Sequence, residues 1–227
     1  MKRSEINHYI KDAKEFIRKN GFHLPPFAFW SPDEWKGKGS EYDEIQNNQL
    51  GWDLTDFGSG DYEKIGLFLF TIRNGNYHDP ANKKTYAEKL MIGLPSQVTP
   101  YHYHKAKMED IINRGGEGQL CIRVYGSIGP RELDEKSPVP VAVDGRNFTV
   151  PAGTVIRLSQ GESISLSRGV FHEFWADKST LLLGEVSMVN DDHTDNYFLK
   201  DQGRFPEIIE DEKPLHLLVG DYEKYRG

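Results

Sequence analysis

The stretch PVAVDGRNFTVPAGTVIRLSQGESISLSRG, residues 140–169, decides the fold class. It contains several short runs rich in β-branched and apolar residues, which glycine, proline and polar residues separate. Comparable runs lie on either side of it: GLFLFTIRNG at 66–75, KTYAEKLMIGL at 84–94, GQLCIRVYG at 118–126 and TLLLGEVSMV at 180–189. Their spacing is close to the roughly 8–12 residues typical of all-β sandwiches and barrels, so we expect a mainly β fold with at least about seven strands.

The N-terminal part has a different pattern. Between residues 4 and 20 apolar residues recur at helical spacing, with Ser4 as the expected N-cap and Gly21 as the C-terminal stop. From 22 to 62 proline, glycine, aspartate and aromatic residues dominate, so we expect an ordered loop that covers part of the core. A short helix is expected at 206–211. We expect a single domain with three parts: a helix and loop extension (1–62), a barrel (63–205) and a C-terminal tail (206–227).

Composition and charge exclude several classes of function. The chain has 227 residues, with 28 lysines and arginines against 35 aspartates and glutamates, and its net charge is −7. This acidic balance argues against nucleic acid as a partner. Cys121 is the single cysteine, which excludes an intrachain disulfide and a metal cage made of thiolates. There is no apolar run near the roughly 20 residues of a membrane span and no signal-peptide pattern, so we expect a cytoplasmic protein with no membrane partner.

The segment YHYHKAKMED at 101–110 suggests a metal site. Side chains at i and i+2 of a strand point to the same face, so a strand here brings His102 and His104 together. Glu109 follows far enough along the chain to turn back towards the pair. Two nitrogens and one oxygen suit a divalent first-row metal ion. The alternative is a histidine pair exposed on an edge strand, which is the more common meaning of such a short motif.

A second segment favours the metal site over that alternative. GESISLSRGVFHEFW at 161–175 places His172 just after a turn made by Ser167, Arg168 and Gly169. Such a turn between two strands would direct His172 into the interior of a β-barrel as a third imidazole.

These two motifs together resemble the paired motifs of the cupin superfamily. The resemblance lies in HxH followed by four residues and Glu, then the glycines near Arg114, and finally Gly161, Ser167, Gly169 and His172 at their mutual spacing. It implies a small antiparallel jelly-roll barrel that holds one metal ion on three histidines and a glutamate. The ligands it implies are His102, His104, Glu109 and His172.

Longer segments are similar to the bacterial D-lyxose isomerase family of cupin sugar isomerases. They are YAEKLMIGLPSQVTPYHYHKAKMEDIINRGGEG, GESISLSRGVFHEFW, GEVSMVNDDHTDN and LGWDLTDFGSGDYEKIGL. The resemblance implies interconversion of D-lyxose with D-xylulose and weaker action on D-mannose and D-fructose. It also implies a manganese-type divalent ion, for which Zn²⁺, Co²⁺ and Fe²⁺ are alternatives, a small-molecule sugar as the substrate, and a homodimer.

Four further residues are candidates for the chemistry. Glu185 comes at the end of an apolar run and is the expected proton shuttle, and Lys107 is expected to stabilise an oxyanion or act as an acid. We expect Asp191 and Asp110 to bind sugar hydroxyls. The alternatives are an acidic surface loop for the residues after Glu185, and a surface ion pair between Lys107 and Asp110.

Two other functions remain open at the level of sequence. An iron-dependent cupin dioxygenase could use the same four ligands, and a non-catalytic sugar-binding cupin could hold a structural metal or none. The carboxylates and amides after Glu185 argue against the apolar pocket that a dioxygenase would need. For an isomerase, proton transfer through an enediol and a hydride shift between the carbons are both open.

Overall fold

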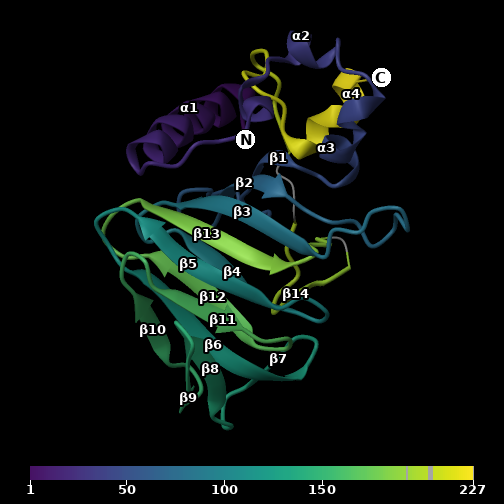
Figure 1. The fold of residues 1–227 in the computed structure, drawn as a ribbon. Coiled ribbons are helices and arrows are strands. Elements are labelled where there is room, and N and C mark those ends of the chain that lie inside the picture. The colour runs from purple at the N-terminus through teal and green to yellow at the C-terminus, as the bar shows by residue number, and fades with distance from the viewer. Residues whose placement is uncertain (193, 204–206, 227) are drawn as a thin grey trace.

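Two antiparallel sheets face each other in the computed structural model of the protein, which describes residues 1–192, 194–203 and 207–226 (Figure 1). The larger sheet contains, in spatial order, β1 (Gly51–Thr55), β2 (Leu67–Arg73), β3 (Tyr86–Gly93), β13 (Leu181–Met188), β5 (Glu109–Gly115), β11 (Ser163–Leu166), β8 (Val139–Val143) and β9 (Arg146–Val150). The smaller sheet contains β10 (Val155–Leu158), β6 (Leu120–Gly129), β12 (Phe171–Ala176), β4 (Val98–His104) and β14 (Asn196–Phe198), and β7 (Glu132–Asp134) pairs with β6. The mainly β antiparallel fold predicted from the sequence is confirmed.

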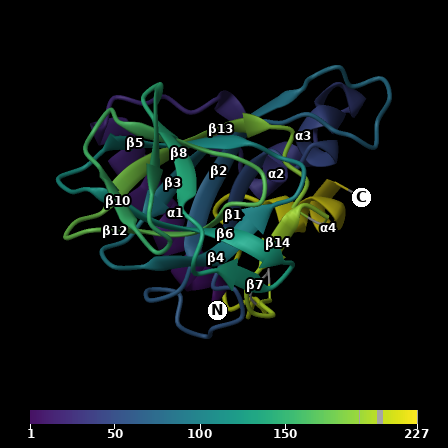
Figure 2. The same cartoon turned by 90° about the horizontal axis from the view of Figure 1, so that it is seen from below.

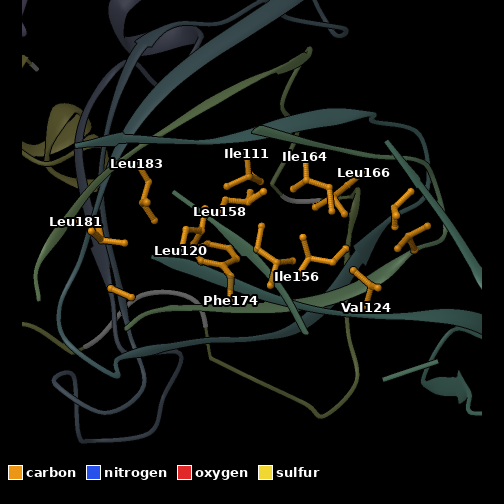
Figure 3. Packing of buried hydrophobic residues seen from close by; sticks show 14 of the residues in the cluster. Ile111, Leu120, Val124, Ile156, Leu158, Ile164, Leu166, Phe174, Leu181 and Leu183 are labelled. Carbon is orange, nitrogen blue, oxygen red and sulfur yellow. The ribbon is translucent and has the colours of Figure 1, made fainter. Parts of the chain in front are cut away.

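The main hydrophobic core fills the space between the two sheets. Ile111, Ile164 and Leu183 point inward from the larger sheet, and Leu120 and Phe174 meet them from the smaller one (Figure 3). All five are buried. This packing follows from the alternation of side chains along each strand, which sends every second residue to the inner face. A polar residue that faces the space between the sheets is therefore buried, unless it lines a pocket that solvent can reach.

Helix α1 (Arg3–Lys19) covers the outer face of the larger sheet near β1, β2 and β3 (Figure 1). Its apolar residues Ile6, Ile10, Ala13 and Ile17 are buried at helical spacing and pack in one cluster with Phe68 and Phe70. The predicted helix is confirmed, and Gly21 follows it with a positive φ of 75°. Among the described residues no helix is both long and apolar enough to cross a membrane.

The start of α1 differs from the prediction. Lys2, not Ser4, is the N-cap residue. The hydroxyl of Ser4 instead donates a hydrogen bond to Asp211 (2.7 Å) in the C-terminal segment. A contact distant in sequence has therefore replaced the local cap.

The segment 22–62 is more regular than predicted. It contains α2 (Pro32–Trp35), α3 (Asp43–Asn47), two 3₁₀ turns (Pro26–Phe29 and Ser40–Tyr42) and strand β1. The expectation of an irregular loop is wrong at β1, which pairs along its whole length with β2. Trp52 and Leu54 pack outward beneath α1, while Asp53 faces the space between the sheets. This extension thus completes the larger sheet as well as covering it.

The C-terminal segment closes against the N-terminus. The buried guanidinium of Arg3 binds Asp221 (2.9 Å) and Glu210 (2.8 Å), and a 3₁₀ turn (Val219–Asp221) leads into α4 (Tyr222–Arg226). The expected helix at 206–211 is wrong for residues 207–211, where Ile209 forms a parallel bridge to Lys2. Residue 206, and with it the expected boundary between barrel and tail, lies outside the described residues.

Candidate metal centre

Two neighbouring strands of the smaller sheet and one strand of the larger sheet bring His102, His104, Glu109 and His172 together. The first two lie on β4, Glu109 begins β5, and His172 on β12 is paired directly with His102. One ligand atom from each of the four residues lies within 4.8 Å of the others. The ring centroids of His102 and His104 are 4.2 Å and 5.8 Å from that of His172. The convergence expected from the sequence is therefore present in the fold.

Backbone carbonyls fix the orientation of two of these rings. Nδ1 of His102 donates to the carbonyl oxygen of Pro100 (2.8 Å), and Nδ1 of His172 donates to that of Val170 (3.0 Å). A neutral imidazole that donates through Nδ1 keeps a lone pair on Nε2. Nε2 of His172 lies 3.1 Å from Glu109 Oε1, and Nε2 of His104 lies 3.2 Å from Glu109 Oε2. The free ring nitrogens and the carboxylate therefore face one point.

The electrostatics favour neutral imidazoles beside an ionised carboxylate. Burial holds the pKa of His102 well below its usual value, and the neighbouring imidazoles lower it further. Burial also lowers the pKa of His104, against the opposing effect of Glu109. For Glu109, burial acts to raise the pKa, but His104 and Lys107 outweigh it and hold the pKa well below the usual range. These are the protonation states that metal coordination requires.

The donor set fits a divalent metal ion. Within the described part of the chain, both ring nitrogens of His104 and Nε2 of His172 are buried without a hydrogen bond of acceptable geometry. Buried polar atoms normally have a partner, so unsatisfied nitrogens that face a carboxylate indicate a missing ligand. Three imidazole nitrogens and one carboxylate oxygen suit Mn²⁺, Fe²⁺, Co²⁺ or Zn²⁺.

A second cluster of charges adjoins the four residues. The ammonium of Lys107 lies 2.8 Å from Glu109 and 2.8 Å from Glu185. On its other side Glu185 lies 3.3 Å from the ammonium of Lys89. Both lysines donate to the side-chain oxygen of Asn190, at 2.8 Å from Lys89 and 3.1 Å from Lys107. The carboxylate of Glu185 is thus held between two buried cations.

Burial affects the two lysines differently. It lowers the pKa of Lys107, but Glu109 and Glu185 outweigh it and raise the pKa above the ordinary value. It lowers the pKa of Lys89 to about 8, because Glu185 compensates only in part. Burial also acts to raise the pKa of Glu185, but Lys107 and Lys89 outweigh it, so the pKa is lowered. Glu185 is therefore ionised at neutral pH and able to accept a proton.

Both clusters open into a cavity of about 250 Å³ between the sheets. Its apolar wall comes from core residues such as Met91, Ile111 and Phe174. Its other polar lining comes from Asp53, Thr55, Thr99, Asn190, Asp192, Asn196 and Gln202. A concave pocket with an apolar wall and polar groups that converge on a candidate metal centre is a candidate small-molecule site, and its many polar side chains suit a hydroxylated ligand.

Two predicted residues lie away from this cavity. Asp110 follows Glu109 on β5, so its side chain points to the opposite face of the sheet, and it is absent from the cavity lining. Lys107 accordingly pairs with Glu109 and Glu185, not with Asp110. Asp191 lies in a neighbouring depression, where it accepts a hydrogen bond from Thr194 (2.6 Å), and Asp192 lines the cavity instead.

Sequence reasoning missed Lys89 and Asp53. A signal was present for each of them. Lys89 alternates on β3 with Ala87 and Met91, which are both buried, so it shares their inner face. Asp53 lies between Trp52 and Leu54 in a strand of strict apolar and polar alternation.

Comparisons with known proteins identify the family of the chain and agree with its fold. The D-lyxose isomerase family matches residues 1–222. The D-lyxose/D-mannose isomerase of Escherichia coli O157:H7 is 42% identical over 100% of both chains, and that of Serratia proteamaculans is 41% identical over 99% of both. The solved L-ribose isomerase of Cellulomonas parahominis has a TM-score of 0.59 at 17% identity and covers 92% of this chain and 98% of its own. This structural match shows that the two chains share a fold.

Proposed function

The chain belongs to the D-lyxose isomerase family of sugar isomerases, and from that membership we propose that it interconverts D-lyxose and D-xylulose with the help of a divalent metal ion. Weaker action on D-mannose and D-fructose is part of the proposal. The observation that carries it is the cavity itself, in which an ionised carboxylate between two lysines adjoins a cluster of three histidines and a glutamate. Metal-assisted isomerisation of an aldose by proton transfer would use both parts together.

His102, His104, Glu109 and His172 would hold the ion, and Mn²⁺ is our first choice. When bound, such an ion would supply Lewis acidity to the sugar during isomerisation. The remaining chemistry falls to side chains of the cavity. Isomerisation requires a proton to leave C2 of the aldose and a proton to arrive at C1.

Glu185 is the proposed proton shuttle. Its carboxylate takes the proton from C2, the electron pair of that bond forms a double bond between C1 and C2, and the carbonyl oxygen on C1 becomes an alkoxide. The hydroxyl proton on the C2 oxygen then passes to the C1 oxygen, a carbonyl forms at C2, and the same carboxyl group returns its proton to C1. Atoms and electrons balance without any oxidant or reductant. Burial acts to raise the pKa of Glu185, but Lys107 and Lys89 outweigh it and lower the pKa. The carboxyl group is therefore ionised before the first proton transfer.

The two lysines support the charge that develops on the sugar. Lys107 is nearer to the metal ligands and would donate a hydrogen bond to an oxygen atom that becomes negative in the enediolate. Lys89 lies on the other side of Glu185 and would balance the carboxylate. Asp192 and Asn196 replace Asp191 and Asp110 as our proposed ligands for sugar hydroxyls.

A panel of aldoses assayed for ketose formation tests the function. We expect the purified, metal-loaded protein to convert D-lyxose into D-xylulose most efficiently and D-mannose into D-fructose less efficiently. Equal turnover under nitrogen would exclude the dioxygenase alternative, and failure to convert any aldose with a full complement of metal would leave only a sugar-binding role. Deuterium from solvent at C1 of the product supports the enediol over a hydride shift.

The remaining expectations concern the whole chain. We propose a cytoplasmic homodimer in which each chain folds as a single domain. Size-exclusion chromatography with light scattering tests the dimer, which predicts about twice the chain mass of 26.0 kDa.

A further inference from the structure

We propose that Phe57 closes the far end of the cavity and sets the preference for a five-carbon over a six-carbon sugar. This inference rests on the proposed function, because it concerns the same cavity and the same reaction. D-Mannose has the configuration of D-lyxose at C2, C3 and C4 and carries one additional carbon beyond C5. Discrimination between the two must therefore come from the end of the cavity opposite the reacting carbons.

The position of the reacting carbons fixes which end that is. C1 and C2 must lie between the four candidate ligands and the carboxylate of Glu185. In the larger sheet Glu185 is paired with Lys89, Lys89 with Thr71, and Thr71 with Gly51 at the start of β1. The sheet thus runs from Glu185 through Lys89 to the edge strand β1, from which Asp53 and Thr55 line the cavity. We therefore place the remaining sugar carbons along this polar wall, beside Asp53 and Thr55.

Phe57 stands where this wall ends. It follows β1, the edge strand of the larger sheet, and its ring centroid lies 5.5 Å from that of Phe198 on β14, the edge strand of the smaller sheet. In Figure 2 the labels of β1 and β14 lie near each other in the middle of the view. Phe198 in turn lies 5.4 Å from the ring of His102. The ring of Phe198 thus contacts both His102 and Phe57, so Phe57 is farther from the candidate metal ligands than Phe198. Phe57 lies between the edge strand of the larger sheet and that of the smaller sheet.

The backbone of Phe57 adopts a strained conformation. Its φ of 53° is in the left-handed region, which aromatic residues rarely adopt. The amide of Phe57 donates to the hydroxyl oxygen of Thr55 (2.9 Å), and the amide of Gly58 donates to the carboxylate of Asp56 (2.9 Å). Glycine would adopt this conformation without strain. Strained residues cluster at functional sites, so the strain at Phe57, which lines the cavity, supports a role for this residue in binding the substrate.

The loop that carries Phe57 packs closely against a second loop. A Cβ atom added to Gly58 would lie 3.2 Å from the backbone nitrogen of Gly203, so the two loops touch through their backbones. Phe57 is buried at 7% exposure even though it is at the edge of the sheet. A hydroxymethyl group at this end of the cavity would have to displace the ring.

Four substitutions test the proposal by the ratio of kcat/KM for D-mannose to that for D-lyxose. Because one extra carbon in a shaped pocket commonly changes kcat/KM by 10-fold or more, we expect Phe57→Ala and Phe57→Gly each to raise the ratio about ten-fold. Phe57→Gly also relieves the backbone strain, so equal shifts in the two variants assign the effect to the ring. Phe57→Trp should lower the ratio, and Phe57→Leu should raise it by a smaller factor. Phe29→Ala removes an exposed ring outside the cavity and serves as the control, with an unchanged ratio.

Ratios within two-fold of the wild type in all folded Phe57 variants overturn the inference. If one variant does not fold, the remaining ones decide. This failure is distinct from failure of the proposed function, in which the wild-type protein would isomerise neither sugar. A ratio that rises in Phe29→Ala as much as in Phe57→Ala would also contradict the role of Phe57.

Discussion

At the scale of single residues, the chemistry depends on a carboxylate with two cationic neighbours. Glu185 is 5% exposed and contacts both Lys89 and Lys107. Two lysines are balanced by Glu185 and, on the side of the metal ligands, by Glu109. Once Glu185 has taken the proton from the sugar, one positive charge remains among these four residues, and it stabilises the enediolate.

Replacing Glu185 by Gln separates catalysis from metal binding. Glutamine has nearly the same shape but cannot accept a proton, so we expect kcat on D-lyxose to fall by about 10²-fold or more. The metal content should not change, because Glu185 is not one of the four proposed ligands. Glu173→Gln, which removes a carboxylate that binds Arg123 away from the cavity, is the control. Full isomerase activity in Glu185→Gln would show that another group moves the proton.

From the lowered pKa of Lys89 we predict that the stability of the metal-free protein depends on pH. Its pKa is lowered to about 8 by burial, against an ordinary value of 10.5. Between these two values the unfolded chain binds more protons than the folded one, so the folded state gains stability as the pH rises through that window and loses it as the pH falls through 8. We expect the wild type to gain about 2–3 kcal/mol relative to Lys89→Met between pH 7 and pH 10.

Urea denaturation of both proteins at the two pH values measures this difference. Lys11→Met, a substitution at an exposed lysine on α1, is the control and should follow the wild type at both pH values. A constant stability difference between the wild type and Lys89→Met would mean that Lys89 keeps its ordinary pKa in the fold.

The residues whose positions were predicted correctly from the sequence are those that spacing along a strand determines. His102 and His104 share a face because they are two apart on one strand. The same rule should have excluded Asp110, which is one residue from Glu109 and therefore faces outward. Lys89 was missed because lysine in a strand is usually exposed, although its alternation with Ala87 and Met91 places it inside.

At the scale of elements, β1 connects the N-terminal extension to the site. The short run Gly51–Thr55 supplies Asp53 and Thr55 to the cavity and Trp52 and Leu54 to the cluster under α1. The longer strand runs were predicted from their β-branched content and turn residues. β1 was missed because it is only five residues long and lies among glycines, aspartates and tryptophans, where composition hides its alternation.

Trp52 gives a test of how firmly the extension is joined to the sheet. Its indole nitrogen donates to the carbonyl oxygen of Ala28 (2.8 Å), and both residues are buried. Trp52→Phe leaves that carbonyl without its partner, so we expect the free energy of unfolding to fall by about 1–3 kcal/mol. Trp175→Phe on β12, a half-buried position, is the control. A loss below about 0.5 kcal/mol in urea denaturation would mean that the extension contributes little to stability.

At the scale of the whole molecule, the site exists because strands distant in sequence become neighbours. β13 lies between β3 and β5, which brings Glu185 beside Lys89 and close to Glu109, and β12 lies beside β4, which brings His172 beside His102. No local pattern encodes these pairings, since they depend on the packing of the complete sheets. The resemblance of the motifs to a known family implied that the four candidate ligands meet, but it did not give these strand pairings. The strand alternation indicates that Lys89 and Asp53 face inward, and the fold shows what they contact.

The most direct test of the account measures metal content and isomerase activity together in the wild type and in His172→Ala. His172 is one of the four proposed ligands and is 1% exposed. A surface side chain could therefore not take its place as a ligand unless the fold changed. We predict about one equivalent of divalent metal per wild-type chain, with activity lost on chelation and restored by Mn²⁺. We predict that His172→Ala loses metal and activity in parallel. Full turnover of D-lyxose by metal-free protein, or unchanged metal content in His172→Ala, would contradict the account.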